Sequence, residues 1–163
     1  MRRTGGRISA AAAGLILLAT CTVFGGSSRN PACDAVGSAA ASEALRREVQ
    51  AKPSPIEGFF FSCEYYLPGT RKALAGLSLY EDEASRHFDA DRADFGEEGP
   101  GTEFLDEDIG VPAYLSVDAN VALAGALDGD RYFIVDIFVD RYGETPGATG
   151  EAAVRLLQAA VGQ

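Results

Sequence analysis

Three cysteines are the residues best placed to do chemistry, and their positions indicate two different fates. Cys21 ends an apolar run and follows Leu18, Ala19 and Thr20, so its thiol is a candidate for acylation. Cys33 and Cys63 lie in the polar remainder of the chain. In an exported protein such a pair is far more often oxidised than free. We therefore expect lipid attachment at Cys21 and a disulfide between Cys33 and Cys63.

The first twenty residues have the composition of an export signal. Arg2, Arg3 and Arg7 form a basic start, and every residue from Ile8 to Ala19 is small or apolar. A run of about a dozen such residues suits a signal peptide and is short for a membrane span of roughly 20. We predict a signal peptide over residues 1–20.

The residues around Cys21 resemble the lipobox of bacterial lipoproteins, in which the thiol is acylated and the signal is cut off just before the cysteine. Thr20 departs from that pattern, which prefers Gly, Ala or Ser at this place. Two alternatives stay open, namely an uncleaved anchor helix that extends to Phe24 or Gly26 and an ordinary cleaved signal. The lipobox predicts a chain anchored by its N-terminal lipid to the extracytoplasmic face of the cell membrane.

The rest of the chain is acidic. The formal net charge is −10, and it falls to −13 when the three signal arginines are removed. Such a charge repels nucleic acid and anionic headgroups, so we expect neither as a partner. About 130–140 residues remain, which is enough for one domain with a single core. We expect a Gly- and Ser-rich tether over residues 21–32 and one domain over residues 33–163.

Helical and strand patterns alternate along that domain. We expect three helices, over residues 34–49, 81–95 and 149–161. We expect five strands, over residues 57–67, 73–80, 111–117, 119–127 and 131–139. Asp128-Gly129 predicts a tight hairpin between the last two strands. The predicted fold is α+β, an antiparallel sheet of about five strands with helices packed on it, in the order α-β-β-α-β-β-β-α.

Side-chain patterns place caps and faces within these elements. Ser38 is expected to cap the first helix and Thr149 the last, whose buried stripe would be Val154, Leu157 and Val161. The first strand presents one apolar face, made by Phe59, Phe61, Cys63, Tyr65 and Leu67. Its disulfide would therefore pin the first helix to the sheet. Closing a loop of about 30 residues contributes roughly 3–4 kcal/mol in the chain-entropy model.

Several features together resemble the actinobacterial lipoproteins grouped as domain-of-unknown-function family 3558. They are Cys33 at a helix start, Cys63 in an aromatic strand, and residues 110–114 before a hairpin and an alanine-rich last helix. Tyr65 stands where that family commonly has an aromatic residue, and the resemblance would cover most of residues 32–162. It implies a lipid anchor, the disulfide and a small α+β domain. It implies no known activity and adds no catalytic residue.

No constellation of residues specifies a reaction. His87 is the only histidine, and we expect it on a helix surface with Glu83 one turn before it. No Gly-x-Ser-x-Gly motif is present, and oxidised Cys33 and Cys63 could not serve Cys-His catalysis. We therefore predict no catalytic residue and no enzyme activity.

The sequence also indicates no metal site and no cofactor site. Asp89, Asp91 and Asp94 superficially resemble a calcium loop, but a loop that starts at Asp89 needs glycine at position 94. One histidine without a cluster of free cysteines does not suit zinc. We predict no metal and no cofactor, and a solvated acidic surface in this region.

Three functions stay open. We expect a non-enzymatic cell-envelope lipoprotein that binds an envelope protein as an accessory module. The first alternative is a carrier of a lipid or other small apolar ligand, in a groove lined by Phe60, Tyr66, Ala122, Ala124 and Ala126. A closed cavity of several hundred cubic ångströms would favour the carrier, and a solid core would favour docking. The second alternative is an envelope hydrolase with an unrecognised acidic site.

The anchor is tested by replacing Cys21 with serine. We expect the variant to lose the mass of a diacylglycerol and to leave the membrane fraction, because the acylated thiol is gone. Cell fractionation and intact-protein mass spectrometry measure both outcomes. A variant that stays membrane-bound with no loss of lipid mass would replace the lipid anchor by an uncleaved helix.

Overall fold

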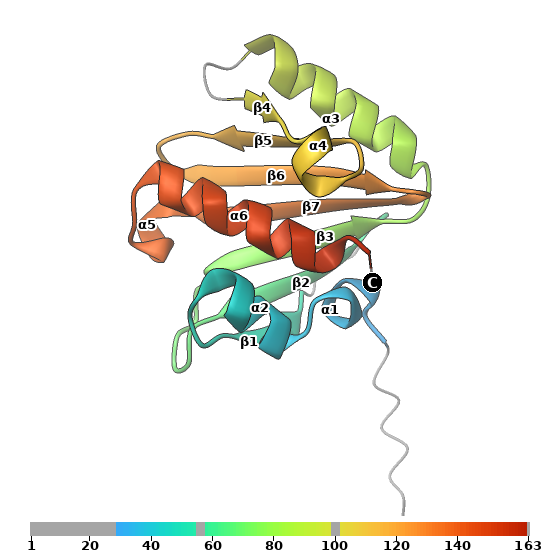
Figure 1. Cartoon of the computed structure of the whole chain (residues 1–163). Coiled ribbons are helices and arrows are strands. Elements are labelled where there is room, and N and C mark those ends of the chain that lie inside the picture. The colour runs from blue at the N-terminus through green and yellow to red at the C-terminus, as the bar shows by residue number, and fades with distance from the viewer. Residues whose placement is uncertain (1–28, 55–57, 99–101, 163) are drawn as a thin grey trace, which may run out of the picture.

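The computed structural model describes residues 29–54, 58–98 and 102–162, which form an α+β fold around one antiparallel sheet. The sheet has the strand order β1-β2-β3-β7-β6-β5-β4 (Figure 1). Its strands are β1 (Gln50–Pro53), β2 (Phe61–Tyr66), β3 (Ala75–Tyr80), β4 (Thr102–Phe104), β5 (Ala113–Val117), β6 (Val121–Asp128) and β7 (Arg131–Phe138). The helices are α1 (Pro31–Ala35), α2 (Ser38–Leu45), α3 (Ala84–Glu98), α4 (Asp106–Ile109), α5 (Val139–Tyr142) and α6 (Pro146–Ala160).

The predicted class and the antiparallel sheet are confirmed, but the predicted order α-β-β-α-β-β-β-α with about five strands is too simple. The described residues form seven strands. Gln50–Pro53, expected at a helix end, pairs with β2, and Thr102–Phe104, expected in a loop, pairs with β5. These edge strands have four and three residues, which is too short for a period of two to show in the sequence.

The first helix is divided rather than continuous over residues 34–49. α1 already begins at Pro31, inside the segment expected to be a tether, and α2 begins after Gly37. Ser38 is not the cap of α2. Its hydroxyl instead accepts a hydrogen bond from the backbone N–H of Ala51 at 2.9 Å, which ties α2 to β1.

The last helix begins three residues earlier than predicted, at Pro146. Thr145 caps it, and proline at the first helical position loses no hydrogen bond. Thr149, the predicted cap, is buried inside the helix and donates to the Thr145 carbonyl at 2.9 Å. Of the predicted stripe only the leucine is fully buried, and the buried face consists of Thr149, Gly150, Ala152, Ala153, Leu156, Leu157 and Ala160.

One face of the sheet is covered by α1, α2 and α6, which lie in front of it in Figure 1. Ala122, Ala124 and Ala126 of β6 point into this layer and have no exposed surface. Their small side chains let α6 lie close to the strands. The alanines therefore belong to the core and line no groove, which corrects the expected ligand site.

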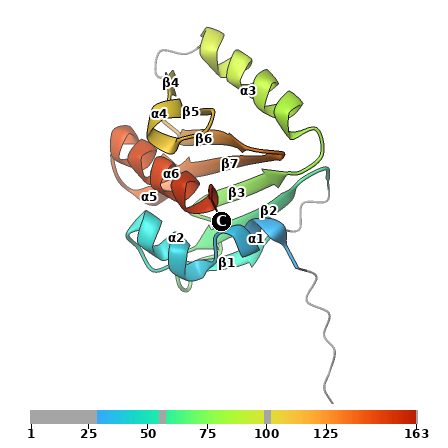
Figure 2. The ribbon, with the colours of Figure 1, turned by 45° about the vertical axis from the view of Figure 1, so that its right-hand side comes forward.

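The opposite face is covered by α3 over part of its width, as Figure 2 shows from the side. Phe88 packs there against Tyr114 and Tyr132. The Tyr132 hydroxyl donates to Asp91 at 2.7 Å and lies 2.6 Å from the Tyr114 hydroxyl. Burial is the main cause that raises the pKa of Tyr132 far above its ordinary value. Asp91, considered above for calcium, thus anchors α3 to the sheet.

Gly125 makes this cluster possible. It lies opposite Tyr114 in the β5–β6 ladder. A Cβ atom at this position would come within 2.6 Å of the Tyr114 ring, so a larger residue would displace the ring from the sheet. The hydroxyl pair therefore depends on a glycine in a neighbouring strand.

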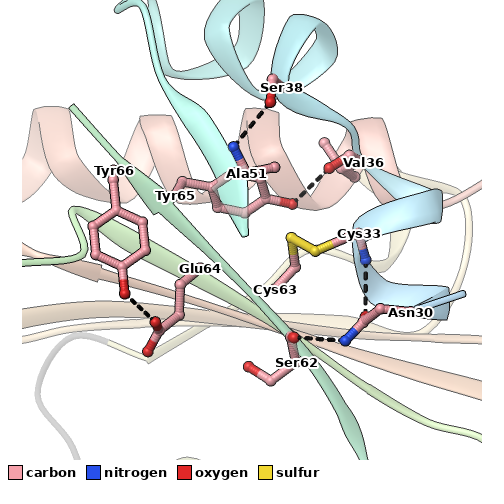
Figure 3. The surroundings of a disulfide bond; sticks show 10 residues. All are labelled: Asn30, Cys33, Val36, Ser38, Ala51, Ser62, Cys63, Glu64, Tyr65 and Tyr66. Atoms are coloured by element: carbon pink, nitrogen blue, oxygen red, sulfur yellow. Dashed lines mark hydrogen bonds between the residues drawn. A yellow bond between two sulfur atoms is a disulfide. The ribbon is translucent and has the colours of Figure 1, made fainter. Parts of the chain in front are cut away.

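The predicted disulfide is present and joins α1 to β2 (Figure 3). Cys63 is fully buried, and the Cα atoms of Cys33 and Cys63 are 5.0 Å apart. The hydroxyl of Tyr65 donates to the Val36 carbonyl at 2.9 Å beside the bridge. A covalent bond and a buried hydrogen bond thus hold the first helices on the sheet, as expected from the strand pattern.

The predicted signal over residues 1–20 and Cys21 lie outside the described residues. Within residues 29–54, 58–98 and 102–162, no helix combines the length and the apolar character needed to cross a membrane. The anchor stays a prediction.

Replacing Cys63 with serine tests what the bridge contributes. We expect the free energy of unfolding to fall by roughly 2–5 kcal/mol, because the unfolded chain regains loop entropy and a buried partner is lost. Urea denaturation of the purified protein measures the change. The parent under reducing conditions is the control and should fall by a similar amount; an unchanged midpoint in both would contradict the role of the bridge.

Candidate functional site

The part of the sheet that α3 leaves uncovered carries an unusual row of residues. Glu64 on β2 pairs with Gly76 on β3, and Gly76 pairs with Asp136 on β7. We call these three residues the acidic row and the surrounding surface the open face. A cavity of about 240 Å³ lies over the row, lined by Phe60, Ser62, Glu64, Ala73, Ala75, Gly76, Ser78, Asp136 and Phe138.

Asp136 interrupts a run of apolar residues in β7. It sits in the middle of β7, between the fully buried Val135 and Ile137, whose side chains point to the opposite face. Gly76 gives its carboxylate room, because a Cβ atom there would lie 2.5 Å from Asp136 Oδ1. The glycine and the aspartate are thus sterically coupled.

The environment of Asp136 favours the protonated acid. Burial raises the pKa of Asp136, the nearby Glu64 carboxylate raises it further, and the Arg141 guanidinium opposes both. A carboxyl group with this balance of burial and neighbouring charge is a candidate for function, since ordinary surface acids show no such shift.

Glu64 is held in place by its own strand. The Tyr66 hydroxyl donates to Glu64 Oε2, and Figure 3 shows both side chains on the side of β2 away from the disulfide. This hydrogen bond is the main cause that raises the pKa of Tyr66. Lys52 Nζ lies 4.8 Å from the centre of the Tyr66 ring, so a cation borders the row on the β1 side.

Arg141 borders the row at the other end. Its guanidinium lies 3.8 Å from the centre of the Phe138 ring and donates to the Ala73 carbonyl at 2.8 Å. Its Nε atom is buried and has no hydrogen-bond partner among the described residues. An arginine stacked in this way is fixed in direction, and its positive charge acts on Asp136, whose pKa it lowers.

Three consecutive phenylalanines lie at the beginning of β2, beside the open face, and strand alternation places Phe61 on the same side of the sheet as Cys63. Phe59 is 90% exposed and Phe61 is 40% exposed. Phe60 turns inward and packs on Tyr80, with ring centres 5.0 Å apart. The predicted apolar face of this strand is therefore right for Cys63 but wrong for Phe59 and Phe61, because no helix covers the beginning of β2.

The other residues considered for chemistry have structural roles. His87, expected on the surface, is half-buried, and its ring centre lies 4.7 Å from that of Tyr80. Glu83 pairs with Arg86 at 2.9 Å instead. Within the described residues, no three His, Cys, Asp or Glu side chains come together as metal ligands.

Asp136 and Gly76 were missed by reasoning from the sequence, although each leaves a signal. Asp136 is one acid in a long apolar run, and Gly76 is a glycine inside a strand, which often marks close approach of another group. No profile of a protein family, no curated protein and no solved structure matches the chain.

The raised pKa of Asp136 gives a stability prediction for Asp136→Asn. Because the folded chain holds this proton more tightly than the unfolded chain, its contribution to stability is complete below the ordinary pKa of 3.8 and is lost as pH rises through the raised value. Asparagine cannot ionise. We therefore expect the variant to gain stability relative to the parent as pH rises from 3.8 through the raised pKa of Asp136.

Urea denaturation at a series of pH values measures this difference. Asp130→Asn, an exposed position in the hairpin turn, is the matched control and should follow the parent. If the stability of Asp136→Asn stayed parallel to the parent over the whole range, the carboxyl group would not be perturbed.

Proposed function

We propose that this chain is a non-enzymatic accessory module of the cell envelope that binds another envelope protein through the open face. The lipobox around Cys21 and the resemblance to the lipoprotein family 3558 support an extracytoplasmic location. The disulfide supports it as well, since such bonds persist in oxidising compartments. The observation that carries the proposal is the exposure of Phe59 and Phe61 at the beginning of β2, next to Phe60, which lines the open face.

The chemistry of this surface suits a protein partner. Large aromatic side chains and arginine are enriched at the centres of protein interfaces. Phe59 and Phe61 supply exposed rings at the beginning of β2, and Tyr66, Phe138 and Arg141 lie half-buried at the other end of the open face. The chain carries a formal charge of −10, so a neutral or basic partner surface would complement it best.

One observation favours the hydrolase alternative. Asp136 has a raised pKa and lies across Gly76 from Glu64, and a pair of carboxyl groups of which one holds its proton more tightly is used in acid-base hydrolysis. A turnover assay with ester, peptide and glycan substrates decides the matter. Activity that Asp136→Asn abolishes would overturn the non-enzymatic proposal.

The docking proposal is tested by the double variant Phe59→Ser and Phe61→Ser. We expect the amount of partner captured by in-cell crosslinking and pull-down from membranes to fall at least about tenfold, because truncating such anchors costs roughly 2 kcal/mol or more. Quantitative mass spectrometry of the captured proteins measures the loss.

Phe104→Ser is the matched control. Phe104 is 54% exposed but lies on β4, at the far edge of the sheet from β1 and β2. Its substitution should leave capture unchanged. Equal capture by the parent and the double variant would place the partner elsewhere, and an equal loss in the control would mean that the exposed rings act without specificity.

A further inference from the structure

A cavity of about 630 Å³ lies between α6 and β5, on the side of the sheet away from the open face. We call it the α6 cleft. It is lined by Glu103, Leu105, Asp108, Leu115, Val117, Gly147, Gly150, Glu151, Val154, Arg155 and Gln158. Its volume is within the range of small-molecule sites, roughly 300–1,000 Å³.

Two glycines of α6 explain the cleft. A Cβ atom at Gly150 would lie 2.9 Å from Val117, so the helix touches β5 there. At Gly147, one turn earlier, a Cβ atom would meet no atom within 4 Å. Leu115 and Val117 face the helix layer but stay half-buried, and α6 presents Gly150 to both of them, since a Cβ atom there would also lie 3.5 Å from Leu115. They form an apolar floor.

The rim of the cleft is negatively charged. Glu103, Asp108 and Glu151 are exposed around it, while Arg155 is the basic residue in its lining. Arg155 is already engaged, since its Nε donates to the Ala44 carbonyl at 2.8 Å and its Nη1 lies 3.8 Å from Glu151. The cleft therefore combines an apolar floor with an excess of carboxylates.

We propose that the α6 cleft binds an amphiphile whose apolar body lies on Leu115 and Val117 and whose ammonium group pairs with the rim carboxylates. Burial of the apolar body supplies the driving force, and the charges select a cation. An anionic amphiphile with the same chain would be repelled, and a neutral one would bind through the floor alone. This site is independent of docking through the open face.

Dodecylamine, dodecanol and dodecanoate are the probes, used below their critical micelle concentrations with the purified full-length protein. Calorimetry or native mass spectrometry should show dodecylamine binding at least about tenfold more tightly than dodecanoate, with dodecanol between them. Equal binding of the amine and the carboxylate would overturn the proposal.

Gly147→Leu fills the cleft without meeting the core and should weaken dodecylamine binding at least about tenfold. Ala39→Leu, an exposed position on α2 outside the cleft, is the matched control and should bind like the parent. Glu103→Gln with Glu151→Gln should remove the preference for the amine and leave dodecanol binding unchanged. Binding that survives Gly147→Leu would place the amphiphile elsewhere.

Phe59→Ser with Phe61→Ser separates this proposal from protein docking. It should leave dodecylamine binding unchanged, because β3, β7 and β6 lie between β2, where these phenylalanines are, and β5, which forms the floor of the cleft. Loss of amine binding in that variant would contradict a site at the α6 cleft.

Discussion

The close packing of α6 on β6 is the contact on which the rest of the structure depends. Ala122, Ala124 and Ala126 are completely buried, and the helix turns alanines and leucines toward them. Small side chains on both surfaces allow a dense, continuous core with little room for a ligand. Binding is therefore proposed at two other places, namely the open face on the reverse of the sheet and the α6 cleft, where the helix carries Gly147 and Gly150.

The open face differs from this apolar face because it carries charged side chains in the middle of the sheet. The Asp136 carboxyl group lies in the centre of the sheet and loses hydration there. Its charged neighbours are Glu64 and Arg141. Gly76 gives up the packing of a side chain to make this arrangement possible. A face built only for stability would place an apolar pair at these two positions, so both departures support the binding role proposed for this face.

Sequence patterns predicted the fold correctly where the whole pattern lies within one strand or one turn. The alternation that predicted burial of Cys63 and Tyr65 is confirmed, as is the hairpin at Asp128, where Gly129 takes a φ of 64°. The sites could not be predicted in this way. The acidic row depends on the register of three strands, and that register is fixed by pairing between segments distant in the sequence. The α6 cleft likewise depends on how a helix meets a strand.

The bridge between Cys33 and Cys63 has a mechanical consequence. If the chain is held by its N-terminus, a pulling force enters at α1 and passes through the covalent link directly into β2. The force would bypass α2 and load β2 against both β1 and β3, whose hydrogen bonds resist sliding together. The segment between Cys33 and Cys63 would then be shielded from the tension, and the strands of the open face would carry it.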